Sequence, residues 1–204
     1  MSLTKTPICD FGKKAENFQL NSTDNKVISL NDVKGENGTL IMFICNHCPY
    51  VKAVIEEVVQ DCKKLESNGI KAVAVCSNDV KNYPEDSFEN MIEFSKNNNF
   101  NFPYLFDETQ EIAKNYGAVC TPDFFGYNKN LELQYRGRIR ELNDLKPVGS
   151  GDSDLYKAMK QIAETGNGPK DQIGSMGCNI KSVSYTHLRA HETEADLVCR
   201  LLLE

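Results

Sequence analysis

Residues 39–49 read Thr-Leu-Ile-Met-Phe-Ile-Cys-Asn-His-Cys-Pro, an unbroken apolar run that ends in two cysteines and a proline. An apolar run of this length predicts a central strand that is covered on both of its faces. From residue 50 to residue 65 the apolar side chains recur at helical spacing, and Asn68-Gly69 stops the pattern. The sequence therefore predicts a strand that passes directly into a helix, with Cys45 and Cys48 at the junction.

The flanking sequence extends this unit into one α/β domain with a central mixed β-sheet and helices around it. An N-terminal β extension is predicted from alternating residues on both sides of Asp24-Asn25. Further strands are expected at residues 70–76 and 102–106 and on both sides of an Asn-Lys-Asn turn at 128–130, and further helices at 86–96, 108–116 and 154–164. The segments 141–151 and 165–181 are polar and contain glycines, so we expect loose structure there.

Composition excludes several classes of partner. The chain has 204 residues, of which 40% are hydrophobic and 25% charged, with a net charge of −6. Nucleic acid and anionic membranes both attract a basic face, so we expect neither as a partner. The first residues lack the apolar core of a secretory signal, and we therefore expect the cytoplasm. Thiols stay reduced there, so the eight cysteines need a role other than structural disulfides.

The last 22 residues of the printed sequence, 183–204, are predicted not to be native. Their first part back-translates to a transposase adapter used in short-read library preparation, and residues 196–203 back-translate to a flow-cell primer in one continuous frame. The native domain then spans residues 1–182, with a core at about 12–166. Without the tail, His47 is the sole histidine of the chain.

A Cys-x-x-Cys pair at the start of a helix indicates redox chemistry. Unpaired N–H groups and the helix macrodipole favour a thiolate on the first sulfur, and the second sulfur lies one helical turn further along. The thiolate attacks a disulfide, and the second thiol resolves the mixed disulfide. We predict Cys45 as the nucleophile and Cys48 as the resolving thiol; Pro49 suits the first turn of a helix.

The residues between the two cysteines modulate this chemistry. A charged His47 would stabilise the Cys45 thiolate, and Asn46 is a candidate accessory residue. The alternative for His47 is a solvent-exposed residue at the helix start with no such role. Half of a zinc site is the alternative for the cysteine pair, but the native part of the chain offers no second close pair and no other histidine, so we expect no metal and no cofactor.

Several motifs together resemble a bacterial thioredoxin-family group that is usually classed with the redoxin and alkyl hydroperoxide reductase/thiol-specific antioxidant (AhpC/TSA) proteins. The resemblance covers about residues 12–181 and rests on these stretches: 43–51 around the cysteine pair, Ser77-Asn78-Asp79, Asn82-Tyr83-Pro84, Pro103-Tyr104-Leu105, 107–110, 120–125 and the ending 175–181. It implies a thioredoxin-like fold and redox-active cysteines, and it names no substrate.

In a thioredoxin-like arrangement, Pro122 would be cis and the backbone of Thr121 would pair with the bound substrate. Cys120 then lies close to the active pair and is a candidate third redox thiol, with a plain loop residue as the alternative. Cys62 and Cys76 are expected to be buried apolar residues. Cys9 and Cys178 lie near expected loose ends, where nothing in the sequence supports a resolving role.

The resemblance leaves two reactions open, disulfide exchange and a peroxiredoxin-like thiol peroxidase with an antioxidant role. Peroxiredoxins resemble one another in a Thr or Ser three residues before the reactive cysteine and in a later arginine. The corresponding residues here are Met42 before Cys45 and Asp123 after Pro122; Arg136 and Arg138 lie further on. Peroxide reduction without such donors would be slow.

We therefore predict a thiol–disulfide oxidoreductase that acts on protein or small-molecule disulfides and uses a thiol reductant. A non-catalytic thioredoxin-fold binding domain is the remaining alternative, although such a domain has no reason to place cysteines at a helix start. The direction of electron flow, the electron donor and the oligomeric state stay open.

Overall fold

The computed structural model describes residues 3–181, and the predicted central strand is β4 (Gly38–Phe43), in which every residue is buried. Its side chains alternate between two apolar cores. Leu40 and Met42 belong to one core, and Ile41 and Phe43 belong to the other. A strand that contributes to two cores cannot show polar alternation, which explains the continuous apolar run in the sequence.

A seven-stranded mixed sheet is built around β4. Its order is β3 (Val27–Ser29), β2 (Gln19–Ser22), β6 (Tyr104–Phe106), β5 (Ile70–Cys76), β4, β8 (Asp123–Asn128) and β9 (Leu133–Tyr135). The three strands β4, β5 and β6 are parallel, while β8 runs antiparallel to β4 along its whole length. The predicted N-terminal extension is confirmed as β2 and β3 at the edge of this sheet.

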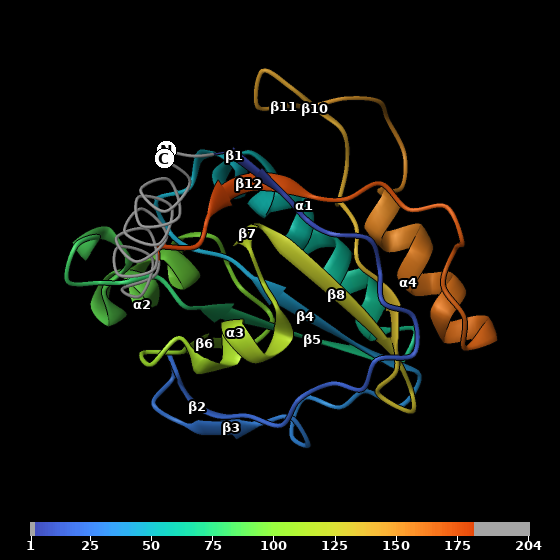
Figure 1. Cartoon of the computed structure of the whole chain (residues 1–204), viewed down its shortest axis with the longest axis horizontal. Coiled ribbons are helices and arrows are strands. Elements are labelled where there is room, and N and C mark those ends of the chain that lie inside the picture. Colours follow the sequence, from blue (N-terminus) through green and yellow to red (C-terminus); the bar gives the residue numbers. More distant parts are fainter. Residues whose placement is uncertain (1–2, 182–204) are drawn as a thin grey trace, which may run out of the picture.

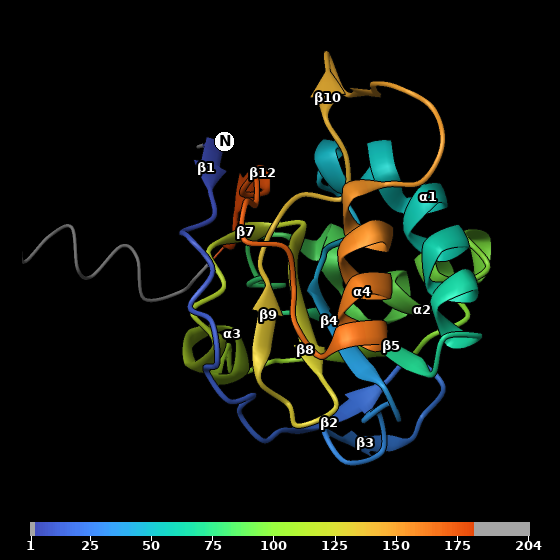
Figure 2. The same cartoon turned by 90° about the vertical axis from the view of Figure 1, so that its right-hand side faces the viewer.

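Helices cover both faces of the sheet (Figures 1 and 2). On one face lie α1 (Pro49–Glu66), α2 (Phe88–Asn97) and α4 (Asp154–Thr165), whose apolar residues pack into the core that contains Leu40. On the other face lies α3 (Glu111–Tyr116), which packs Ala113 and Tyr116 against Phe43 and Phe125. A short 3₁₀ helix, η1 (Pro84–Asp86), precedes α2. The predicted mixed sheet with flanking helices is confirmed.

A second, three-stranded sheet lies beside the end of β4 that leads into α1. It consists of β1 (Leu3–Lys5), β12 (Met176–Asn179) and β7 (Cys120–Thr121), with β12 in the middle. A separate hairpin of β10 (Leu142–Asn143) and β11 (Lys146–Pro147) projects from the molecule (Figure 1).

The expectation of loose structure at 141–151 and 165–181 is wrong for these strands. The segment Met176–Asn179 is too short, and too rich in glycine, to show the alternation of polar and apolar residues that predicts a strand. This segment becomes a strand because β1 and β7 pair with its two edges. The predicted non-native segment 183–204 lies outside the described residues. Within residues 3–181, no helix combines the length and the apolar character that crossing a bilayer requires.

Candidate active site

The two predicted redox cysteines lie where β4 passes into α1. Cys48 is the N-cap residue of α1, and Pro49 occupies the first helical position, where its missing N–H leaves no intrahelical bond unmade. Both cysteines are buried, with Cys45 1% exposed and Cys48 fully enclosed. The strand-to-helix junction predicted from the sequence is therefore confirmed, with both sulfurs inside the protein.

Thr121 joins the two cysteines from a distant part of the chain. The peptide bond between Thr121 and Pro122 is cis, as expected. The hydroxyl of Thr121 lies 3.3 Å from Sγ of Cys45, and its carbonyl oxygen accepts a bond from Sγ of Cys48 at 3.1 Å. The fold thus brings together the Cys-x-x-Cys motif and the Thr-Pro motif.

The two thiols titrate as one unit. Direct contact between the sulfurs is the largest influence on both: it lowers the pKa of Cys48, to about 4, and raises the pKa of Cys45. The carbonyl of Thr121 accepts a hydrogen bond from the Cys48 thiol, which favours a protonated Cys48, while the Thr121 hydroxyl can donate to Cys45 and favours its thiolate. The low pKa therefore belongs to the pair, which holds one proton at neutral pH.

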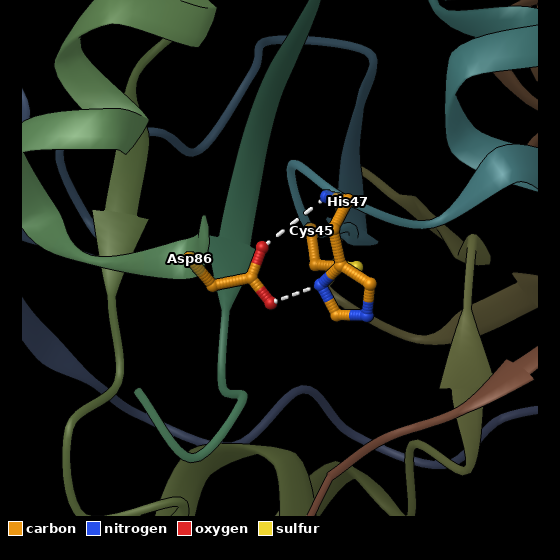
Figure 3. Close-up of side chains that lie close together, drawn as sticks. All are labelled: Cys45, His47 and Asp86. Carbon is orange, nitrogen blue, oxygen red and sulfur yellow. Dashed lines mark hydrogen bonds and ion pairs between the residues drawn. The ribbon is translucent and has the colours of Figure 1, made fainter. Parts of the chain in front are cut away.

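Asp86 organises the loop between the cysteines (Figure 3). Its buried carboxylate accepts the backbone N–H of Asn46 at 2.8 Å and that of His47 at 3.3 Å, and it lies 2.7 Å from Nδ1 of His47. The side-chain amide of Asn78 donates to it at 2.7 Å. A carboxylate that accepts several bonds at once fixes both the loop and the imidazole ring.

His47 is enclosed, so the solvent-exposed alternative for this residue is wrong. Its side chain is 12% exposed, and its ring stacks on that of Tyr83 with centroids 5.5 Å apart. The bond to Asp86 through Nδ1 fixes the orientation of the imidazole ring. The carboxylate of Asp86 also disfavours negative charge on Cys45 and contributes to the raised pKa of that thiol.

Asn46 is a structural member of the site. Its side-chain amide donates to the carbonyl of Glu85 at 3.1 Å, and its side-chain oxygen accepts the hydroxyl of Tyr104 at 3.0 Å. These bonds tie the loop to η1 and to β6. Asn46 is buried and points away from the solvent, which makes it a positioning residue for the pair.

Sequence reasoning missed the role of Asp86, which it treated only as the start of a helix. The residue lies about 40 positions after the cysteines, in a Pro-Glu-Asp segment that has ordinary helix-start chemistry. Only the tertiary fold shows that η1 points this carboxylate at the Cys-x-x-Cys loop. The neighbouring Ser77-Asn78-Asp79 motif was a usable signal, because Asn78 shares Asp86 with the loop.

Donor atoms of Cys45, His47 and Asp86 lie within 4.8 Å of one another, a spacing that invites comparison with a metal site (Figure 3). Nδ1 of His47 and Oδ2 of Asp86 are only 2.7 Å apart. Two ligands of a tetrahedral zinc ion are separated by roughly 3.3 Å, given bonds of about 2.0–2.1 Å. The observed spacing fits a hydrogen bond, and a metal would require the two side chains to separate.

The remaining cysteines differ in their relation to the pair. Cys62 and Cys76 are buried in α1 and β5, as expected, and burial raises the pKa of both thiols. Cys120 is fully enclosed on β7, its Sγ is 3.6 Å from the carbonyl of Pro122, and burial raises its pKa. Cys178 lies on β12 and contacts Cys48, which corrects its expected place in a loose end.

A cavity of about 280 Å³ adjoins Pro122. Its walls include the apolar side chains of Tyr50, Pro122, Ile139, Leu142 and Met176 and the charged side chains of Lys5, Arg138, Arg140 and Glu141. Tyr50 follows the cysteine pair by two residues, so the cavity is next to the candidate site. A mostly apolar hollow with a few polar groups is typical of ligand sites.

The two arginines considered from the sequence are engaged elsewhere. Arg136 donates to the carboxylate of Asp123 at 2.9 Å and to the carbonyl of Gly117 at 2.7 Å. Arg138 is bonded to Asp154 at 2.9 Å. These bonds hold β8, β9 and α4 together, and neither guanidinium makes a recorded bond to Cys45 or Cys48.

Comparison with known proteins agrees with the fold. Residues 11–142 match the AhpC/TSA family. The crystal structure of an uncharacterized conserved protein from Geobacillus kaustophilus is 40% identical, with a TM-score of 0.84, over 89% of this chain and 97% of that one. The thioredoxin domain of a thiol-disulfide oxidoreductase from Bacteroides vulgatus is 13% identical, with a TM-score of 0.58, over 75% of this chain and 97% of that one. The fold is therefore thioredoxin-like.

Curated relatives carry a functional name. The thiol-disulfide oxidoreductase ResA of Bacillus thuringiensis is 27% identical over 131 residues, which are 62% of this chain and 69% of that protein. The ResA protein of Bacillus subtilis is 29% identical, over 57% of this chain and 61% of the relative. The match thus covers about two thirds of the length of these relatives, and it supports a thiol-disulfide oxidoreductase activity in general terms.

Proposed function

The chain belongs to the AhpC/TSA family, and from this premise we propose that it is a thiol–disulfide oxidoreductase that works through Cys45 and Cys48. One observation carries the proposal. Two cysteines at the N-terminal end of α1 are in direct contact, and both lie within 3.3 Å of Thr121, the residue that precedes Pro122. A reactive thiolate at neutral pH is the requirement for disulfide exchange.

The reaction proceeds in two exchanges. The Cys45 thiolate attacks one sulfur of a substrate disulfide, which forms a mixed disulfide and releases the other substrate sulfur as a thiolate. Cys48 then loses its proton and attacks Sγ of Cys45, which forms the Cys45–Cys48 disulfide and releases the second substrate thiol. Two electrons have passed to the substrate, and an external thiol reductant restores the pair. The same steps run in reverse if the pair acts as an oxidant.

His47 and Asp86 have supporting roles in this proposal. A protonated His47 would offset negative charge on the pair, and Asp86 holds its imidazole ring through Nδ1 at 2.7 Å. The same carboxylate holds the backbone of the loop that carries both thiols. We therefore assign His47 to charge balance and Asp86 to positioning.

The cavity beside Pro122 suits the apolar surroundings of a substrate disulfide. Tyr50 and Met176 are among its lining residues, and Met176 is 47% exposed. Protein disulfides are the substrate class that the named relatives support, and small-molecule disulfides are also within the proposal. We retain the cytoplasm as the proposed compartment; alkylation of the reduced pair in intact cells tests it.

The experiment compares two reactions of the same protein. The wild-type chain is expected to accelerate insulin reduction by dithiothreitol, and the Cys45→Ser variant is expected to lose this acceleration. Cys62→Ser serves as the control, because Cys62 is buried in α1 away from the pair and Ser is of similar size. Hydrogen peroxide consumption is measured in parallel and is expected to stay at the uncatalysed rate.

Two outcomes contradict the proposal. Fast peroxide consumption that requires Cys45, without insulin reduction, identifies a thiol peroxidase. If neither reaction depends on Cys45, the chain is a binding domain on this fold, and the cysteine pair has no catalytic role.

A further inference from the structure

The strand β12, in the middle of the three-stranded sheet, lies beside the cysteine pair. It runs antiparallel to β7, with Cys178 opposite Thr121 and Asn179 opposite Cys120. In a thioredoxin-like arrangement the backbone of Thr121 is expected to pair with a substrate. In this protein β12 makes that pairing itself, with Cys178 opposite Thr121. Figure 1 shows β12 beside β7.

The pairing decides the direction of the Cys178 side chain. Residues directly opposite each other in an antiparallel pair project their side chains to the same face, and successive residues project to opposite faces. The side chain of Thr121 faces Cys45 at 3.3 Å. The side chain of Cys178 therefore lies on the same face as that of Thr121, toward the pair, and that of Cys120 projects from the opposite face of the strand.

Contacts of Cys48 agree with this geometry. Its sulfur interacts with both the backbone N–H and the thiol of Cys178, and it bonds to the carbonyl of Thr121 at 3.1 Å. Cys45, Cys48 and Cys178 all contribute to the apolar core that contains Leu40. Cys48 thus interacts with the thiols of both Cys45 and Cys178.

The close approach of β12 depends on a glycine. A Cβ atom at position 177 would lie 2.1 Å from the carbonyl oxygen of Thr121, a distance that only displacement of the strand relieves. Gly177 therefore permits β12 to lie directly against the Thr121-Pro122 peptide. The neighbouring Cys178 reaches Cys48 as a result.

We infer that Cys178 is a third redox-active thiol, which exchanges with the Cys45–Cys48 disulfide to form a Cys48–Cys178 disulfide. The Cys178 thiolate attacks Sγ of Cys48, the new S–S bond forms, and the old one breaks. Cys45 leaves as a thiolate and takes up the proton that Cys178 released. No electrons enter or leave in this step. The inference rests on the proposed function for the origin of the first disulfide.

The exchange has a functional consequence. It replaces the Cys45–Cys48 disulfide with a Cys48–Cys178 disulfide and returns Cys45 to its reduced form. The disulfide is then held between Cys48 and Cys178 while Cys45 is reduced, and the reverse exchange restores the Cys45–Cys48 disulfide. A chain with two active cysteines has no such state.

The test uses the full chain with Cys45 substituted, so that Cys45 cannot form a disulfide with Cys48. The Cys45→Ser variant is oxidised with a slight excess of diamide, and its disulfides are mapped by mass spectrometry of peptides. We expect a Cys48–Cys178 linkage within one chain, with the loss of two free thiols. The matched controls are the double variants Cys45→Ser/Cys178→Ser, which should lose the linkage, and Cys45→Ser/Cys120→Ser, which should keep it.

A linkage of Cys48 to Cys120, a disulfide between two chains, or a Cys48 that stays reduced overturns the inference. The oxidised wild-type chain provides a second measurement that needs no substitution, since exchange should yield both the Cys45–Cys48 and the Cys48–Cys178 linkages. Detection of Cys45–Cys48 alone rejects the third thiol and leaves the proposed function intact. If the wild-type chain does not accelerate insulin reduction, the proposed function is rejected, while the disulfide mapping alone decides the Cys48–Cys178 linkage.

Discussion

At the scale of single residues, the reactivity of the site comes from charges that the fold places within a few ångströms of two sulfurs. The motif Cys-Asn-His-Cys predicts which residues carry the chemistry, and this assignment stays a prediction. It was insufficient to predict their protonation, because Asp86 and Thr121 reach the pair from segments far away in the sequence. A short motif specifies the reacting atoms, and the tertiary contacts specify their charge.

The shared proton of the pair predicts an unusual pH dependence of alkylation. Contact between the sulfurs lowers the pKa of Cys48 to about 4, so one thiolate is present at neutral pH and is lost as the pH falls through that value. The rate of iodoacetamide reaction with the reduced pair should be nearly constant from about pH 6 to pH 8. Stopped alkylation followed by mass spectrometry measures this rate.

The Cys48→Ala variant is the matched control for that measurement. Cys45 then lacks its sulfur neighbour, and the rate should rise steeply with pH, as it does for an ordinary buried thiol. A wild-type rate that climbs tenfold per pH unit up to pH 9 would contradict the shared proton.

Asp86 should contribute strongly to stability as well as to the site. Asp86→Ala removes the acceptor of two backbone N–H groups and of the Asn78 amide, which leaves buried donors without partners. We expect a loss of about 2–4 kcal/mol in the free energy of unfolding by urea. Glu85→Ala, at an exposed neighbouring position, should change stability by less than about 0.5 kcal/mol. Equal effects of the two substitutions would show that the carboxylate is not structural.

At the scale of elements, the helices and the strands of the seven-stranded sheet were predictable, whereas the short strands β1, β10, β11 and β12 were not. The apolar run of β4 and the helical spacing of apolar residues in α1 predict these two elements from local sequence alone. The strand β12 does not, because its sequence Met-Gly-Cys-Asn has no period and its pairing comes from β1 and β7. Cys178 was consequently expected in a loose end, although it lies against the redox pair.

The role of glycine in β12 is testable. Gly177→Ala places a methyl group 2.1 Å from the carbonyl oxygen of Thr121, so β12 must move away from β7. We expect a loss of about 1–3 kcal/mol in stability and faster hydrogen exchange of the β12 amides. Met176→Ala, on the same strand with its side chain 47% exposed, is the control and should leave exchange in β7 unchanged. Unaltered exchange in Gly177→Ala would contradict the close packing of the two strands.

At the scale of the whole molecule, the mixed sheet carries the site. A buried ion pair joins β8 to the residue that follows β9 at one side of this sheet. Predicting the architecture was feasible because one strand with two apolar faces implies helices on both sides of a sheet. The pair of Arg136 and Asp123 was not predictable as a pair, since the sequence gives the two charges but not their contact. The fold uses Arg136 to hold β8 and the end of α3.

This ion pair predicts a large cost on removal of one partner. Asp123→Ala leaves the Arg136 guanidinium buried without its carboxylate, and we expect a loss of about 3–5 kcal/mol in the free energy of unfolding. Lys14→Ala breaks an exposed pair with Glu132 and should cost less than about 1 kcal/mol. Urea denaturation measures the free energy of unfolding of both variants, provided that its dependence on urea concentration is unchanged. Comparable losses in the two variants would contradict the structural weight given to the buried pair.

The central claim is that Cys45 attacks a disulfide and Cys48 resolves the product, and trapping the mixed disulfide tests it most directly. The reduced Cys48→Ser variant is incubated with oxidised glutathione, and the position of any adduct is mapped by mass spectrometry. The claim predicts one stable glutathione adduct, on Cys45, whereas the wild-type chain proceeds to its internal disulfide and releases glutathione. An adduct that forms on another cysteine, or no adduct at all, would contradict it.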